Sequence, residues 1–232
     1  MLAAFCIRRA GEPAPPAGLR GPGGGEVRLL EEGPLGVWVA EGAVPAATVE
    51  SIGAHDAVVR TALRTATPVP ARYGTTFSDE QEARASLRER EEELCAALER
   101  VADRVEMGLR VTWGEEAPVD PRGAVTAGEG AGGAAAPSGR AFLLARRREM
   151  EERADLRERA DAVLNEVEEL VGLNGYPCVR KVLPERGVAG LLAHLVHRRE
   201  ARSYRERVDA ARRNLPGVGL HLSGPWAPYS FV

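Results

Sequence analysis

The chain has 232 residues, enough for one or two domains with a sizeable core, and its 31 Lys and Arg against 34 Asp and Glu leave a net charge of −3. This balance gives no bulk attraction for nucleic acid. A basic cluster at 146–148 is closely flanked by acidic residues, so we interpret it as a solvated helix face. We therefore expect no nucleic-acid partner.

Cys6, Cys95 and Cys178 are widely spaced, and no C-x-x-C motif is present. An odd, sparse set indicates reduced thiols in a cytosol-like compartment and argues against a disulfide framework or a zinc site. Residues 1–7 are too short for a signal peptide, and no apolar run approaches the roughly 18 residues of a membrane helix. We expect a soluble, cytoplasmic protein with no membrane partner.

The first half of the chain alternates strand and helix patterns. The expected elements are strands at 2–7, 26–30 and 35–40, a helix at 48–65, an extended segment at 69–75 and a helix at 78–103. The stripe expected to face the core is Val49, Ile52, Val59 and Leu63 in the first helix, and Leu87, Leu94, Leu98 and Val101 in the second. Ser78 and Gln81 have the spacing of a capping box, which would begin the second helix.

The second half has clearer periodicity. The expected elements are a period-2 strand at 105–113, a mobile Gly/Ala-rich loop at 114–139, a long helix to about residue 171, strands at 178–183 and 189–196, a helix at 199–214 and a strand at 218–223. The long helix should bury Leu156, Ala160, Val163, Leu164, Val167 and Leu170. The 189–196 strand is apolar on both faces apart from His194, so it should be central in its sheet.

This order, β-α-β-β-α-β, is typical of a ferredoxin-like domain. The sequence thus predicts an α+β protein of two domains, an α+β domain at 1–103 and a ferredoxin-like domain at 104–223, followed by an extended aromatic and proline-rich tail at 224–232.

The tail is the most unusual segment, because aromatic residues are 5% of the chain yet Trp226, Tyr229 and Phe231 fall within it. Pro225 and Pro228 prevent a helix and exclude a central strand. A terminus with nothing to contact is usually polar and frayed, so this one should fit a groove. The groove could lie on this chain or on a partner protein.

The segment from Arg72 to Thr75 is a second candidate for a specific contact. Gly74 suggests a backbone conformation that excludes a Cβ, and Arg72 could pair with a carboxylate or stack on an aromatic ring. Two interpretations stay open, a structural turn that ends a strand and a contact with the tail or a partner.

Patterns that suggest chemistry are weak. A G-x-G-x-x-G match at 128–133 lies in low-complexity sequence, which favours a loop over cofactor binding. His194, His197 and Glu200 span a strand and a helix, so convergence on a metal is not expected. His55 beside Asp56 favours a structural role at a helix end over acid–base catalysis. We expect no catalytic residue, cofactor or metal, and no enzymatic activity.

Four segments resemble the GvpL/GvpF family of gas vesicle proteins. The ending Gly-Pro-Trp-Ala-Pro-Tyr-Ser-Phe at 224–231 is similar to the C-terminal signature of the family, with Ala227 in place of a third proline. The segment 68–75 resembles its Pro-x-Arg-Phe-Gly-Thr motif with Tyr73 for Phe. The third and fourth matches are the His-Asp pair at 55–56 and the Val-Glu strand at 105–111.

The resemblance implies a non-enzymatic accessory or minor structural protein of gas vesicle assembly. Such a protein would be cytoplasmic, associated with the gas vesicle, and would bind the small hydrophobic shell protein and other accessory proteins. The residues expected to make these contacts are Arg72, Tyr73, Trp226, Pro228, Tyr229 and Phe231. The alternative is a small-molecule-binding regulatory module, by analogy with other ferredoxin-like domains.

Overall fold

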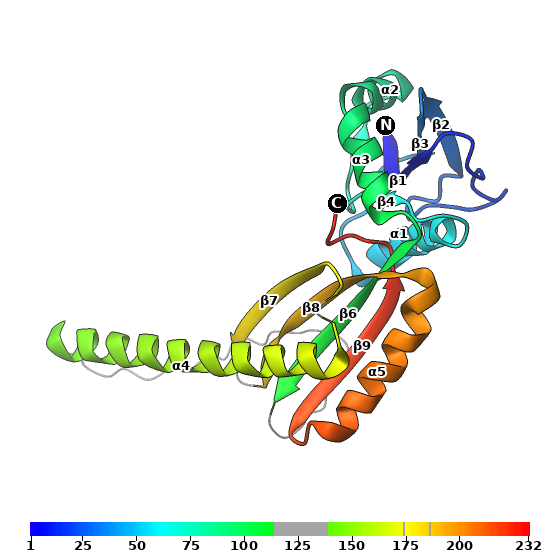
Figure 1. Cartoon of the computed structure of the whole chain (residues 1–232). Helices are drawn as coiled ribbons and strands as arrows, with labels where there is room; N and C mark the ends of the chain where they lie inside the picture. Colours follow the sequence, from blue (N-terminus) through cyan, green and yellow to red (C-terminus); the bar gives the residue numbers. More distant parts are fainter. Residues whose placement is uncertain (114–138, 174, 186) are drawn as a thin grey trace.

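The computed structural model describes residues 1–113, 139–173, 175–185 and 187–232 (Figure 1). The loop predicted to be mobile therefore lies outside the described residues, apart from residue 139, which begins a helix. The elements are β1 (Leu2–Arg9), β2 (Val27–Glu32), β3 (Leu35–Glu41), α1 (Val49–Leu63), β4 (Val69–Pro70), β5 (Thr76–Phe77), α2 (Glu80–Glu89), α3 (Glu91–Val101), β6 (Arg104–Trp113), α4 (Gly139–Val171), β7 (Cys178–Glu185), β8 (Val188–His197), the 3-10 turn η1 (Arg198–Glu200), α5 (Ala201–Asn214) and β9 (Val218–Trp226).

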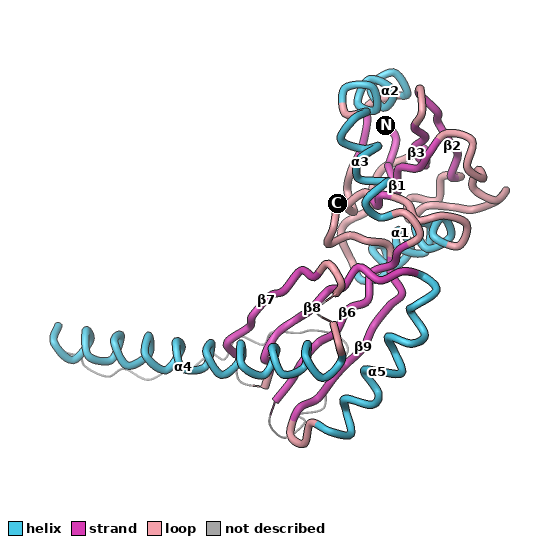
Figure 2. Tube along the Cα trace, in the orientation of Figure 1, coloured by secondary structure: helices cyan, strands magenta, loops and turns pink. Residues whose placement is uncertain are grey.

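The first sheet is antiparallel in the order β2-β3-β1-β4, and β5 also pairs with β1 (Figure 2). One face packs against α1 through a core that contains Phe5, Trp38 and Val59. The other face packs against α2 and α3 through residues such as Val37 and Leu94. The chain thus has a mixed α and β fold, as predicted, and the strands expected at 2–7, 26–30 and 35–40 are all present.

Helix α1 forms where predicted, and Val59 and Leu63 of the expected stripe are buried. Thr48 is its N-cap, and it forms a capping box with Ser51. The side chain of each residue accepts a hydrogen bond from the backbone amide of the other, so these two amides do not stay unpaired. Val49 is 88% exposed and Ile52 46% exposed, so their expected place in the core is wrong. The other buried residues of the helix are Ser51, His55, Val58 and Ala62.

The single helix expected at 78–103 is two helices, α2 and α3, which meet at Arg90. The N-cap of α2 is Asp79, which accepts a hydrogen bond from the Glu82 amide, so the expected Ser78–Gln81 capping box is also wrong. The predicted apolar stripe is nevertheless correct, since Leu87, Leu94, Leu98 and Val101 are all buried. The break lets both short helices follow the twisted sheet.

The second sheet is antiparallel in the order β7-β8-β6-β9, with α4 and α5 on one face. Alternate residues of β6 are buried against these helices, as its period-2 pattern predicts. Strand β8 lies between β7 and β6, which confirms that it is central. Residues from α4, α5 and β6 share one core that includes Met107, Leu164 and Tyr204.

Only the C-terminal part of α4 covers the sheet. Ala160, Leu164 and Val167 are buried as predicted, whereas Leu170 is 47% exposed and Val171 is buried in its place. The N-terminal turns of α4 project away from the sheet (Figures 1 and 2). Gly172, with a φ of +66°, ends the helix in the left-handed conformation that glycine adopts readily.

Strand β9 continues to Trp226, three residues beyond the expected end of the last strand. The predicted tail at 224–232 therefore begins inside the sheet. Pro225 is tolerated because β9 is an edge strand that pairs only with β6. Only residues 227–232 lie outside regular structure at this terminus.

Candidate functional site

The C-terminal segment, residues 227–232, packs on the first half of the same chain (Figure 1). Ala227 and Pro228 are buried, and the ring of Tyr229 packs against the core beneath α1. Phe231 packs against the separate core beneath α2 and α3. Burial raises the pKa of Tyr229, so its phenol stays neutral. Of the two surfaces considered for the tail, this chain itself provides one.

Hydrogen bonds from Ser230 to the carboxylate of Glu106 hold the segment in place. The amide nitrogen of Ser230 donates to one carboxylate oxygen of Glu106 at 2.8 Å, and Ser230 Oγ donates to the other at 2.8 Å. The Phe231 amide donates to the Pro228 carbonyl at 3.1 Å, which closes a turn. Because Glu106 belongs to β6, these bonds connect the C-terminal segment to the second sheet as well.

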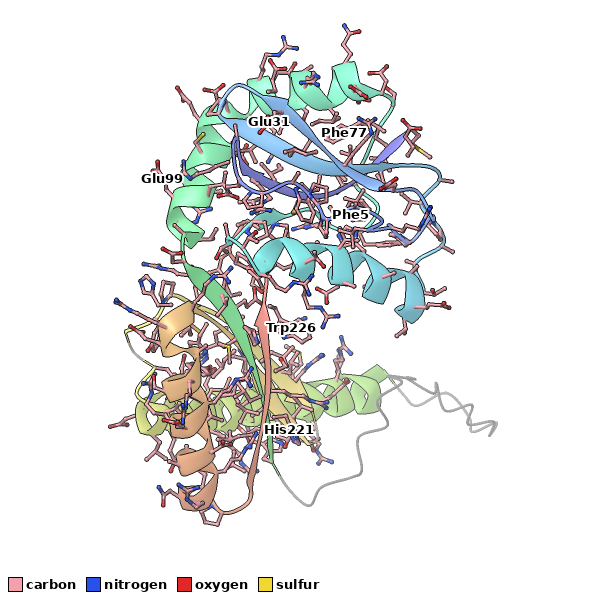
Figure 3. The ribbon with its side chains drawn as sticks, turned by 90° about the vertical axis from the view of Figure 1, so that its right-hand side faces the viewer. Phe5, Glu31, Phe77, Glu99, His221 and Trp226 are labelled. Carbon is pink, nitrogen blue, oxygen red and sulfur yellow. The ribbon has the colours of Figure 1, made fainter. Side chains whose placement is uncertain are left out.

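Trp226 connects the end of β9 to α1 (Figure 3). The guanidinium carbon of Arg60 lies 5.7 Å from the centroid of the indole ring, within range of a cation–π interaction. Asp56, one turn earlier on α1, holds the same guanidinium with an ion pair of 2.9 Å.

The segment from Arg72 to Thr75 forms a turn beside this region. Tyr73 donates its hydroxyl proton to the Pro45 carbonyl at 2.8 Å, and its ring meets His55 edge to face at 5.6 Å. Gly74 has a φ of +91°, which a residue with a Cβ rarely adopts. The Arg72 side chain is exposed and borders the groove described below.

His55 lies in the middle of α1, not at a helix end as expected, and is buried. Its Nε2 lies 3.0 Å from the Ala71 carbonyl, to which a neutral imidazole donates. Burial lowers the pKa of His55, against smaller opposing effects of that carbonyl and of Asp56. His55 thus joins α1 to the turn at Arg72–Thr75.

The lowered pKa predicts acid sensitivity. The unfolded chain protonates His55 near pH 6.5 and the folded chain at a lower pH, so the stabilisation is complete above pH 6.5 and is lost as pH falls toward the folded pKa. We expect His55→Gln, which keeps an amide donor but does not titrate, to lose less stability than the wild type between pH 7.5 and pH 5.5. Urea unfolding at both pH values measures this difference, and equal losses would contradict the prediction.

An apolar groove of about 430 Å³ lies between the first sheet, α2 and α3. Ile7, Phe77 and Leu87 contribute to its apolar lining, and its charged lining consists of Arg72 and the ion pair of Arg90 with Glu93. Tyr229 and Val232 of the C-terminal segment line it as well. The groove and the C-terminal segment therefore form one continuous surface, with apolar walls and charged groups beside them.

The comparisons with known proteins agree along the whole chain. The sequence profile of the family "Gas vesicle synthesis protein GvpL/GvpF" matches residues 2–232. The chain belongs to the GvpL/GvpF family of gas vesicle proteins. It is 34% identical over 252 aligned positions to gas vesicle protein L of Streptomyces sp. (strain CB03234), covering 98% of this chain and 91% of that protein.

Two crystal structures show the same fold at low sequence identity. Gas vesicle protein GvpF from Anabaena sp. PCC7120 superposes with a TM-score of 0.75 at 12% identity, covering 99% of this chain and 94% of the other. GvpF from Microcystis aeruginosa gives a TM-score of 0.73, also at 12% identity, with 99% and 98% covered. The expected family and the gas vesicle connection are thus confirmed.

In this GvpL/GvpF family member, the four segments that carry the family resemblance come together in space. His55 touches Tyr73, Arg60 links the neighbouring Asp56 to Trp226, and Glu106 holds Ser230. These segments are far apart in sequence, so the fold brings them to one site at the junction of the two sheets.

Sequence reasoning missed two contributors to this site. The stacking of Arg60 on Trp226 and the contact of Glu106 with Ser230 join residues 166 and 124 positions apart, and no local pattern reports such pairs. The alternation in β6 did place Glu106 on the face opposite the buried core, which is the signal that was available.

The remaining sequence patterns that were considered for cofactor, metal or membrane binding can be compared with the structure. The G-x-G-x-x-G match at 128–133 lies outside the described residues. Glu200 accepts a hydrogen bond from the Tyr176 hydroxyl at 3.0 Å, whereas His194 is buried beside Tyr204, so they serve separate contacts. Among the helices of the described residues, none combines the length and apolar character that crossing a membrane requires.

Proposed function

We propose that this protein is an accessory or minor structural protein of gas vesicle assembly. It binds the small hydrophobic shell protein and other accessory proteins in the cytoplasm and stays associated with the vesicle. In this proposal it acts without catalysis or a cofactor, and neither nucleic acid nor membrane is a partner. The family membership supports the setting, and the apolar groove supports the mode of binding.

The groove is the observation that carries the proposal. Its volume of about 430 Å³ falls within the range of sites that enclose a ligand or several apolar side chains. Ile7, Phe77 and Leu87 offer apolar contacts, and the exposed Arg72 can bind a polar group that flanks an apolar segment of the partner. An apolar shell subunit held there would have less surface free to aggregate.

The proposal also assigns separate structural units to the two halves of the chain. Residues 1–103 form the unit that carries the groove, and residues 104–223 form a ferredoxin-like unit, supported by the strand order β7-β8-β6-β9 and the two helices on one face. The C-terminal residues bridge the two units: Ser230 bonds to Glu106 of β6, and Phe231 packs in the first unit.

Filling the groove should abolish binding. Ser86 lines the groove from α2, so Ser86→Trp places an indole inside it. We expect at least a tenfold loss of co-purified shell protein when the two proteins are co-expressed, because the apolar partner and the indole compete for one space. The matched control is Glu89→Trp, which adds the same indole to an exposed position of the same helix and should bind as the wild type does.

Circular dichroism establishes that the variants are folded, and Arg72→Glu tests the same groove from its exposed border if Ser86→Trp does not fold. Equal binding by the wild type and the groove variants would show that the shell protein docks elsewhere. No binding by the wild type would count against the adaptor function and favour the small-molecule-binding alternative.

A further inference from the structure

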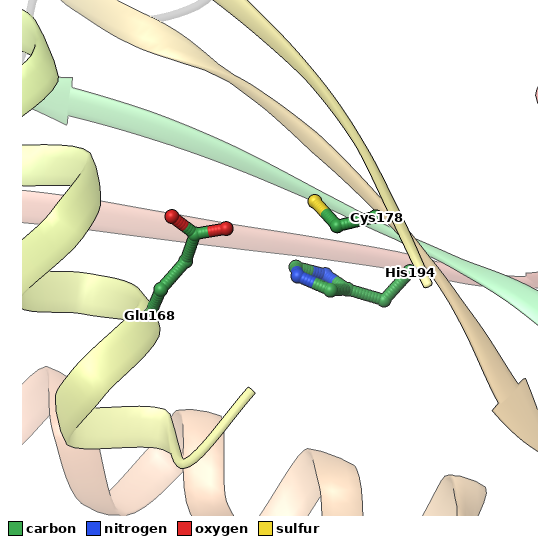
Figure 4. Close-up of side chains that lie close together, drawn as sticks. All are labelled: Glu168, Cys178 and His194. Atoms are coloured by element: carbon green, nitrogen blue, oxygen red, sulfur yellow. The ribbon is translucent and has the colours of Figure 1, made fainter. Parts of the chain in front are cut away.

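Three side chains with metal-binding groups lie together in the second half of the molecule, away from the groove. Glu168 comes from α4, Cys178 is the first residue of β7, and His194 belongs to β8. One potential ligand atom from each lies within 4.8 Å of the other two (Figure 4). Cys178 and His194 are direct partners in the β7–β8 ladder, which places their side chains on the same face.

His194 has a buried ring nitrogen that is available to coordinate a metal ion. It is fully buried, and its Nδ1 lies 3.0 Å from the hydroxyl of Tyr204. Its Nε2 has no hydrogen-bond partner among residues 1–113, 139–173, 175–185 and 187–232. A buried polar atom without a partner is costly and calls for an explanation. Figure 4 shows the imidazole ring extending toward the carboxylate of Glu168.

The surroundings of His194 favour the form that binds metals. When Nδ1 carries the proton and donates to Tyr204, the lone pair of Nε2 is free. A neutral imidazole oriented through its other nitrogen is the usual arrangement of a histidine ligand.

Glu168 is oriented by a similar outer contact. Arg180 donates to Glu168 Oε2 at 2.8 Å and forms a second ion pair, of 2.7 Å, with Asp161. The carboxylate keeps a second oxygen that can bind an ion. Cys178 is exposed, which gives an ion a route to the cluster from solvent.

The chemistry of the three groups selects the ion. One cysteine thiolate, one imidazole and one carboxylate suit Zn²⁺, whereas Mg²⁺ and Ca²⁺ prefer oxygen ligands throughout. The Cys178 thiol releases its proton to solvent when the ion binds. Zn²⁺ bonds of about 2.0–2.3 Å require the ligand atoms to approach to roughly 3.5 Å. The exposed Cys178 and half-buried Glu168 can make this small movement, while the ladder and Tyr204 hold His194.

We propose that Glu168, Cys178 and His194 bind one Zn²⁺ ion, which fastens α4 to β7 and β8. Water or a further ligand completes the tetrahedral shell. The proposal goes beyond the shell-binding function and does not depend on it. It also departs from the expectation of no metal site, which rested on the sparse cysteines without a C-x-x-C motif and on the separation of His194 from His197 and Glu200 in the predicted elements. Strand pairing brings the cysteine and the histidine together across 16 residues, and a local motif cannot report this.

The test titrates metal-free, full-length protein with Zn²⁺ alone. We expect one equivalent to bind and to raise the melting temperature, because a ligand that binds only the folded state stabilises it. Co²⁺ used as a spectroscopic probe should give a thiolate-to-metal charge-transfer band. In Cys178→Ser the band should disappear, and affinity for Zn²⁺ should fall at least tenfold.

Cys95→Ser is the matched control, since Cys95 lies on α3 outside the cluster. This variant should bind Zn²⁺ as the wild type does. If Cys178→Ser does not fold, Glu168→Gln provides a second variant and should also lose at least tenfold in affinity. The proposal is overturned if the wild type does not bind one equivalent, if binding is equal in the wild type and the cluster variants, or if Cys95→Ser abolishes it.

Discussion

Removing residues 227–232 is expected to lower the free energy of unfolding by about 4–6 kcal/mol. The half-buried rings of Tyr229 and Phe231 together account for about 2–3 kcal/mol of lost apolar burial. Loss of the two Ser230 hydrogen bonds to the Glu106 carboxylate adds about 2–3 kcal/mol. Such a loss is a large part of the roughly 5–15 kcal/mol that stabilises a typical domain.

The cut belongs after Trp226 and not after Ser223, because β9 includes residues 224–226 and an earlier cut would damage the second sheet. Urea unfolding followed by circular dichroism measures the change. Deleting only Val232, which is 41% exposed, is the control and should cost less than about 0.5 kcal/mol. Ser230→Ala, expected to cost about 1–2 kcal/mol, separates the hydrogen bond of the hydroxyl from the packing.

A truncated chain as stable as the wild type would show that the C-terminal segment makes no net contribution to the fold. Its aromatic side chains would then be available for contacts with a partner. The measurement thus tests how much the contacts of this segment with its own chain stabilise the fold.

Leu164→Ala is expected to destabilise the protein by about 2–5 kcal/mol, the range for truncating a fully buried leucine. Leu164 packs directly over β8, where a Cβ added at Gly190 would lie 2.7 Å from its Cδ1. The cavity left by the substitution would therefore lie between α4 and the sheet, where the backbone has little freedom to collapse.

Leu170→Ala on the same helix is the matched control. Leu170 is 47% exposed, so the same substitution should change the free energy of unfolding by less than about 0.5 kcal/mol. Thermal or urea unfolding of both variants gives the comparison. Similar losses at the two positions would mean that α4 packs on the sheet through a different face.

Local sequence patterns were sufficient for most elements and for the family. Alternation in 105–113 and the apolar spacing from Leu87 to Val101 each act over a few residues, and each gave the expected burial. The aromatic and proline-rich ending, with three weaker segments, indicated the GvpL/GvpF family that the full-length comparison shows.

Backbone preferences and side-chain periodicity are local properties, so the order of residues was enough to predict which segments become strands and helices, and the terminal motif was enough to predict the family. The exposure of Val49 and Leu170 and the break between α2 and α3 follow instead from how the elements pack on the two sheets. The tertiary structure alone brought Glu106 to Ser230 and Cys178 to His194. Those contacts depend on how separate elements pack and pair, so they cannot be predicted from any short stretch of sequence.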